Sequence, residues 1–261
     1  MSGTGLAIGS LFDVSGRRVL VTGGTAGLGL MIARAFVVNG ARVFITGRDP
    51  ARLAEAGAEL AALGDCTAIP ARLGPVAGAE ALARDLAERT DRLDVLVNNA
   101  GMGWVAPFEE FPEAGWDKVF DLNLKTPFFL VQQLLPLLKA AAREDRWARV
   151  INLSSVSARS TGPATLVYGA SKAAVEQMTR GMAKVLAPHR VLVNAIAPGF
   201  FPSRANDRLP DGAAQAWMAG AAVGRLGTAE DIGGLAIFLA SRAGAFVDGQ
   251  VIDIEGGRLG G

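Results

Sequence analysis

A cluster of glycines stands between a short apolar segment and an amphipathic segment in this 261-residue chain. Residues 17–22 (RRVLVT) have the composition of a buried strand, and residues 22–29 (TGGTAGLG) follow directly. Apolar side chains then recur at helical spacing as far as Asn39 and Gly40, where we expect the helix to end. A strand, a glycine turn and a helix in this order predict the first half of a βαβ unit, which belongs in a parallel sheet.

Strands and helices are predicted to alternate along the rest of the chain. The expected strands cover residues 17–22, 42–46, 66–70, 93–97, 149–153, 191–196 and 250–254. The expected helices follow the glycine turn, then cover 50–63, 75–88, 113–142 and a stretch ending at 186, with helical pieces between about 211 and 241. Pro127 and Pro136 predict a kink or a break in the longest helix. The alternation predicts an α/β fold, a Rossmann-type doubly wound parallel sheet of about seven strands with helices on both faces, in one domain over 1–261.

Charge and composition argue against several classes of function. Lys and Arg total 26 against 25 for Asp and Glu, so a formal charge of +1 gives no electrostatic basis for binding nucleic acid or an anionic membrane. The longest apolar stretch, 119–138, is interrupted by charged residues and prolines, and the first residues lack a signal-peptide pattern. One histidine, His189, and one cysteine, Cys66, give no basis for a metal site or an internal disulfide. We therefore expect a cytoplasmic enzyme.

The glycine cluster and the end of the second strand together indicate a dinucleotide. Glycines at 23, 27 and 29 let the backbone approach a pyrophosphate, which then lies at the N-terminus of the next helix. Proteins that select NAD place an acid at the end of the second strand to bind the ribose 2′-hydroxyl. Here that position holds Arg48, and the next acid, Asp49, is expected to cap a helix. Because a guanidinium suits a 2′-phosphate, NADP(H) is predicted in preference to NAD(H).

The only tyrosine, Tyr168, lies four residues before Lys172 in a segment that we expect to be helical. That spacing puts both side chains on one helical face, roughly 6 Å apart along the axis. An ammonium beside a phenol stabilises the phenolate, and lowering a pKa of about 10 by ~3 units takes roughly 4 kcal/mol. The pair therefore suits an acid that works near neutral pH, although a surface tyrosine beside a solvated lysine has the same pattern.

Further motifs follow one another in a fixed order along the chain. They are TGGTAGLG at 22–29, NNAG at 98–101, Asn123 within DLNL, Ser155 after the fifth strand, Tyr168-x-x-x-Lys172, and Pro198-Gly199 after the sixth strand. In this order they resemble the short-chain dehydrogenase/reductases, in their short single-domain branch, over nearly the whole chain. Within this family the chain is most similar to the 3-oxoacyl reductase and ketone reductase group. The similarity rests on the residues at 197–204 (APGFFPSR), at 224–241 (GRLGTAEDIGGLAIFLAS) and in the closing DIEGG.

The resemblance implies a role for each motif residue. Tyr168 acts as the general acid in carbonyl reduction or as the base in oxidation, and Lys172 lowers its pKa and holds the nicotinamide ribose. Ser155 hydrogen-bonds the substrate oxygen, and Asn123 helps to hold a water that passes protons to Lys172. The implied cofactor contacts are Gly23, Thr25, Ala26, Gly27, Leu28, Gly29, Arg48, Leu73, Asn99, Tyr168, Lys172, Phe201 and Ser203.

Two positions depart from the family pattern. Arg72 stands where an Asp often contacts adenine, and Thr25-Ala26 stand where NADP-using members often carry a basic residue.

The resemblance also implies a reaction, the NADPH-dependent reduction of a ketone to a secondary alcohol. The expected substrate is a 3-oxoacyl-type or similar small apolar carbonyl compound. One alternative is a sugar or polyol dehydrogenase that works in the oxidative direction. A second is a dinucleotide-binding sensor without turnover, although such a protein needs none of the four catalytic residues together.

Two variable segments are expected to shape the substrate site, the loop at 102–112 and the segment of about 197–225. Four apolar side chains either line that site or pack in the core: Met102, Trp104, Phe200 and Trp217. A homo-oligomer, dimer or tetramer, is implied by resemblance alone, through the helix that carries Tyr168 and the helix over 113–142.

Overall fold

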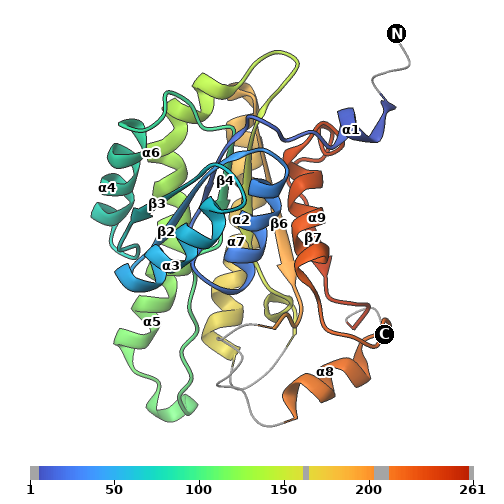
Figure 1. The fold of residues 1–261 in the computed structure, drawn as a ribbon. Helices are drawn as coiled ribbons and strands as arrows, with labels where there is room; N and C mark the ends of the chain where they lie inside the picture. The colour runs from blue at the N-terminus through green and yellow to red at the C-terminus, as the bar shows by residue number, and fades with distance from the viewer. Residues whose placement is uncertain (1–5, 161–164, 203–211, 259–261) are drawn as a thin grey trace.

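The computed structural model describes residues 6–160, 165–202 and 212–258, and its centre is a seven-stranded parallel sheet (Figure 1). The strands run in the order β3-β2-β1-β4-β5-β6-β7, and every neighbouring pair is parallel. They are β1 (Arg18–Val21), β2 (Arg42–Gly47), β3 (Cys66–Pro70), β4 (Val95–Asn98), β5 (Ala148–Leu153), β6 (Val191–Pro198) and β7 (Val251–Ile254). The predicted doubly wound sheet is confirmed, and the strand order reverses between β1 and β4.

Helices cover both faces of the sheet, as predicted. One apolar core lies between the sheet and α2 (Gly27–Val38), α3 (Pro50–Ala61) and α9 (Ala229–Ala240). A second core lies on the other face, beneath α4 (Val76–Ala87), α6 (Thr126–Ala141) and α7 (Leu166–Leu186). The remaining α-helices are α1 (Ile8–Leu11), α5 (Glu113–Phe120) and α8 (Ala213–Gly220). The central strands are apolar on both sides because both sides are covered.

Local sequence signals account for several element boundaries. Asp49 caps α3, accepting hydrogen bonds from the backbone N of Ala51 at 3.0 Å and of Arg52 at 3.2 Å, and Pro50 opens the helix, as predicted. Gly40, just after α2, has a φ of +77°, which a residue with a side chain rarely adopts. Four short single-turn elements had no sequence signal: α1, η2 (Phe108–Glu110), η4 (Val156–Ala158) and η6 (Ala187–His189).

The long helix predicted over 113–142 is interrupted just before Pro127, whereas it continues through Pro136. The interruption is η3 (Asp121–Lys125), a π-helical segment between α5 and α6. Pro127 lies in the first turn of α6, directly after η3, and Pro136 lies inside α6, which continues past it. A π-helical segment has no characteristic residue in the sequence, as a proline is for a break. Such segments are frequent at functional sites.

The carboxyl ends of all seven strands meet at one edge of the sheet because the strands are parallel. In open α/β sheets, ligands bind at this edge, where the strand order reverses. Among the residues that the structure describes, no helix is long and apolar enough to cross a membrane.

Candidate active site

The glycine turn after β1 has a backbone that only glycine permits. Gly23 and Gly27 have φ values of +65° and +55°, in the left-handed region. A Cβ on Gly29 would lie 2.3 Å from the carbonyl oxygen of Gly23, so this helix start can carry no side chain there. The turn therefore brings bare backbone to the carboxyl edge of β1.

The end of β4 holds this turn in place. Nδ2 of Asn99 donates to the backbone oxygens of Thr22 at 2.8 Å and Gly23 at 3.1 Å. In return, Oγ1 of Thr22 accepts from the backbone N of Asn99 and of Ala100, both at 3.0 Å. Asn99 is thus a turn-holding residue in this structure. Its implied contact with a cofactor stays a prediction.

The N-terminus of α2 fits an anionic group. Its N-cap residue, Ala26, makes no side-chain capping hydrogen bond, and the first turn contains no acid. The first N–H groups of a helix lack intrahelical partners and carry a positive partial charge, which favours a phosphate. The α3 N-terminus differs, because Asp49 already caps it. The glycine turn and the uncapped α2 N-terminus therefore fit the pyrophosphate of a dinucleotide.

Arg48 lies just beyond β2, beside this turn in the fold. Its side chain is exposed and has no hydrogen bond or ion pair with any described residue. Thr25 packs against the end of β2, because a Cβ on Gly47 would lie 2.5 Å from its Cγ2. Arg72 is also exposed, whereas Leu73 is half-buried against the core. Arg48 is thus available to a phosphate at the position that discriminates the two dinucleotides.

Tyr168, Lys172 and Ser155 meet at the carboxyl end of β5. Lys172 on α7 is 4% exposed, and its Nζ donates to the backbone oxygen of Leu153 at 2.6 Å. The same Nζ lies 5.6 Å from the centre of the Tyr168 ring. Ser155 is the N-cap residue of η4 and its side chain is hydrogen-bonded to that of Tyr168. The three predicted catalytic side chains are thus brought together, Ser155 from the turn after β5 and the other two from α7.

Burial dominates the acid–base properties of the pair. It lowers the pKa of Lys172 from 10.5 to about 8. Burial also raises the pKa of Tyr168, and the hydrogen bond with Ser155 opposes this rise. Lys172 is not among the causes that shift the pKa of Tyr168, so the expected lowering of this pKa by the lysine is not found in the protein by itself.

Asn123, in the π-helical segment η3, connects the loop after β4 to α7. Its Oδ1 accepts from the backbone N of Met102 at 2.8 Å, and its Nδ2 donates to the Met102 oxygen at 2.9 Å. Nδ2 also donates to Oγ of Ser171 at 3.0 Å, and that hydroxyl donates to the Tyr168 backbone oxygen at 2.7 Å. The amide therefore fixes the backbone beside the tyrosine. The implied water bound by Asn123 stays a prediction.

Sequence reasoning missed Ser171, and the cofactor contact that the resemblance implies for Phe201 stays a prediction. Ser171 lies inside the Tyr168–Lys172 motif, and only its fully buried position could have marked it. Phe201 is buried beneath Gly227, where a Cβ would lie 2.4 Å from its ring, so it packs in the interior. Ser203, the other implied contact after β6, lies outside the described residues. Phe200 and Trp217 form a tilted ring pair with centres 6.1 Å apart.

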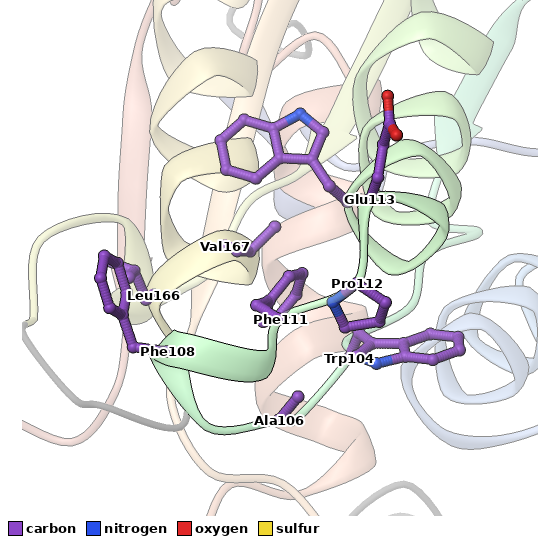
Figure 2. A pocket seen from close by; sticks show the side chains of 9 residues that line it. Trp104, Ala106, Phe108, Phe111, Pro112, Glu113, Leu166 and Val167 are labelled. Carbon is purple, nitrogen blue, oxygen red and sulfur yellow. The ribbon is translucent and has the colours of Figure 1, made fainter.

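An apolar cavity of about 280 Å³ lies at the N-terminal end of α7 (Figure 2). Neither Ser155 nor Tyr168 lines it. A larger one, of about 610 Å³, lies along α5, α6 and α7 and shares Trp116 with the first. The first is lined by Trp104, Ala106, Phe108, Phe111, Pro112, Glu113, Trp116, Leu166 and Val167.

Two other chemistries find no support in the described residues. No group of three His, Cys, Asp or Glu side chains there is placed to hold a metal ion. Burial raises the pKa of Cys66 to about 11, so its thiol stays protonated and unreactive at neutral pH.

Several known proteins are similar to this chain in sequence and in fold. The family described as "Enoyl-(Acyl carrier protein) reductase" matches residues 23–258. The 3-oxoacyl-acyl-carrier-protein reductase of rhamnolipid biosynthesis from Pseudomonas aeruginosa is 47% identical over 94% of this chain and 97% of its own length. The gluconate 5-dehydrogenase of Gluconobacter oxydans is 35% identical over 95% and 96%. A solved RhlG/NADP active-site complex from Pseudomonas aeruginosa superposes with a TM-score of 0.91, at 47% identity, over 95% of this chain and 98% of that one.

The chain therefore belongs to the short-chain dehydrogenase/reductase family, and it is an oxidoreductase.

Proposed function

We propose that this protein reduces a ketone to a secondary alcohol with NADPH. The observation that carries the proposal is the meeting of Ser155, Tyr168 and Lys172 at the carboxyl edge of the sheet, beside an uncapped glycine turn. The 3-oxoacyl reductase and RhlG/NADP relatives support this choice of reaction and cofactor.

The residues of the site divide the chemistry between them. A bound nicotinamide supplies hydride to the carbonyl carbon. Negative charge then develops on the substrate oxygen, and the hydroxyls of Ser155 and Tyr168 are donors aimed at that oxygen. Tyr168 gives up its proton there as the general acid. The Lys172 ammonium, held by the Leu153 carbonyl, stabilises the phenolate that remains.

NADPH binding is assigned to the turn after β1 and to Arg48. The backbone from Gly23 to Gly29 takes the pyrophosphate, and the exposed guanidinium of Arg48 takes the 2′-phosphate. The lack of an acid at the end of β2 removes the usual partner of the NAD 2′-hydroxyl. The other implied contacts, Leu73 and Asn99 among them, belong to the same proposal.

We propose a 3-oxoacyl-type or similar small apolar carbonyl compound as the substrate. The nearest alternative is oxidation of a sugar alcohol, which the gluconate 5-dehydrogenase relative favours. Both reactions use the same catalytic residues, so the substrate loop of about 197–225 makes the choice. The protein works as one domain over 1–261, in the cytoplasm.

We also propose that the protein is a homo-oligomer. Large apolar side chains are exposed on α5, α6 and α7, and two of them, Trp116 and Phe128, line the cavity of about 610 Å³. They are Trp116, Phe128, Leu166 and Val185. An apolar face of this kind marks a protein–protein contact, and a second copy would cover it. Analytical ultracentrifugation tests the assembly, and a monomer at micromolar concentration would contradict it.

A substrate panel tests the proposed reaction. Ketones, 3-oxoacyl thioesters and sugar alcohols are each assayed with NADP(H) and with NAD(H). The expected result is turnover of the 3-oxoacyl thioesters or ketones with NADPH as the preferred reductant. Turnover of sugar alcohols alone favours the alternative, and binding of NADPH without turnover of any compound favours a sensor.

A further inference from the structure

An ion pair that the proposed reaction does not use joins a buried carboxylate, Glu176, to a partly exposed arginine, Arg159, whose side chain is 40% exposed. Glu176 is one helical turn after Lys172 on α7, and its side chain is 7% exposed. Nη2 of Arg159 donates to its Oε1 at 3.2 Å, and Oγ of Ser154 lies 3.1 Å from the same oxygen. A carboxylate this buried needs such partners, because an unpaired buried charge has a large desolvation cost.

Arg159 connects three separate elements. It directly follows η4, and its guanidinium reaches Glu176 on α7 and Asp253 on β7. Nη1 donates to Oδ2 of Asp253 at 2.6 Å and Nη2 donates to Oδ1, a two-pronged geometry that fixes the planar group. Nη2 of Arg180 lies 3.9 Å from the second oxygen of Glu176, so two cations balance two carboxylates.

The segment η4 is a single turn, with Ser155 as its N-cap residue and Arg159 as its C-cap residue. Ser155 begins it and accepts from the backbone N of Ser157 at 3.1 Å. Arg159 ends it, and its backbone N donates to the Val156 oxygen at 3.0 Å. A displacement of Arg159 is therefore passed on to Ser155, whose hydroxyl must stay within reach of Tyr168.

We propose that Arg159 and Glu176 are positioning residues for the reduction. Their ion pair holds η4, and with it Ser155, at a fixed place against the helix that carries Tyr168 and Lys172. Neither charged group touches the phenol or the ammonium, so the pair acts through Ser155. The inference rests on the proposed function, in which the Ser155 hydroxyl donates to the substrate oxygen.

A double-mutant cycle between Arg159 and Ser155 tests the proposal. Arg159→Met is expected to lower kcat for the best ketone substrate by about tenfold or more, since a displacement of ~1 Å at a catalytic group can cost about 10²-fold. In a Ser155→Ala background the same substitution is expected to change the residual kcat less than about twofold, because no hydroxyl remains to be positioned. An equal factor in both backgrounds would overturn the proposal.

Matched variants separate positioning from stability. Arg34→Met removes an exposed ion pair with Glu59 between α2 and α3, on the face of the sheet opposite to α7, and is expected to leave kcat unchanged. Arg159→Lys keeps a cation and is expected to regain most of the kcat that Arg159→Met loses. An Arg159→Met enzyme that is no slower than Arg34→Met would contradict the proposal. If Arg159→Met does not fold, Glu176→Gln, which keeps the side-chain shape, takes its place in the same cycle.

The single Ser155→Ala variant shows whether the positioning role alone fails or the proposed function fails as well. If Ser155→Ala retains full kcat, the serine is not catalytic and the proposed function fails together with the inference. If Ser155→Ala is strongly impaired while the Arg159→Met factor is the same in both backgrounds, only the positioning role fails.

Discussion

Two buried cations lie at opposite ends of strand β5, and they differ in how fully their donors are used. Arg149, near the amino end, is 3% exposed and donates to four backbone oxygens, two of them at the C-terminal end of α9. Lys172, against the carboxyl end, is equally buried. Among the described residues, its Nζ donates only to the Leu153 oxygen.

The difference separates a structural cation from a reactive one. Burial lowers the pKa of Arg149 to about 10 and that of Lys172 to about 8. The arginine stays charged at neutral pH, and its donors cap the negative end of α9. The lysine keeps donors for a ligand beside Tyr168, and its charge responds to pH within the working range. Burial alone therefore does not identify a functional group, and what distinguishes Lys172 is its position beside Tyr168.

The largest expected effect comes from the reactive cation. Lys172→Met removes the charge that stabilises the Tyr168 phenolate, so kcat/KM for ketone reduction is expected to fall by about 10³-fold. Steady-state NADPH oxidation measures it, and circular dichroism checks that α7 still folds. A loss of less than about tenfold would mean that Tyr168 works without the lysine.

The structural cation is expected to change stability instead. Arg149→Met leaves backbone oxygens at the end of α9 without a donor, so the free energy of unfolding should fall by about 2 to 3 kcal/mol. Urea denaturation measures it, while the KM for NADPH stays unchanged. Arg242→Met, an exposed neighbour bonded to Ser10, is the control, with an expected change within about 0.5 kcal/mol. Equal stability of the two variants would contradict the capping role.

The dependence of kcat/KM on pH tests whether the charge of Lys172 takes part in the reaction. The pKa of Lys172, about 8, lies below its usual 10.5, so its charged form predominates at neutral pH and is lost as pH rises through 8. Burial keeps the Tyr168 pKa above 10, so the phenol stays protonated over that range. kcat/KM for reduction should therefore fall by roughly tenfold per pH unit above about 8. A profile that stays flat to about pH 9.5 would place the lysine charge outside the mechanism.

A smaller effect is expected at the cofactor end of the site. Arg48→Ala should raise the KM for NADPH by about tenfold, the equivalent of ~1.4 kcal/mol, and leave the KM for NADH nearly unchanged. Arg52→Ala is a matched control, because this exposed arginine on α3 instead pairs with Asp49 at 3.7 Å. An equal response of both dinucleotides to Arg48→Ala would remove the argument for the 2′-phosphate.

The sheet was largely predictable from sequence because its signals are local. Apolar runs, the glycine turn and the Asp49-Pro50 start of α3 each depend on a few adjacent residues, and the structure confirms them. A break in the long helix was predicted at its prolines, and it lies just before Pro127 as the π-helical segment η3, whose type depends on what Asn123 bonds to across the fold. Phe201 was assigned to the cofactor site by resemblance, and its burial beneath Gly227 depends on packing far along the chain.

The sequence was enough to predict which residues form the site, but not how deeply they are buried or which side chains surround them. Tyr168 and Lys172 follow from helical spacing, and the structure keeps them on one face. The direction of the tyrosine pKa depends on burial, which no spacing reveals. The buried partners of the site, Ser171 and Glu176, look like ordinary helix residues in sequence.

The most direct test is turnover by Tyr168→Phe with NADPH binding measured in the same preparation. The substitution removes one hydroxyl and keeps the ring, so NADPH fluorescence titration should give a Kd within about twofold of the wild type. Ketone reduction should fall by about 10³-fold or more, because the general acid is gone. Turnover within about tenfold of the wild type, at equal NADPH binding, would contradict the assignment of Tyr168 as the acid.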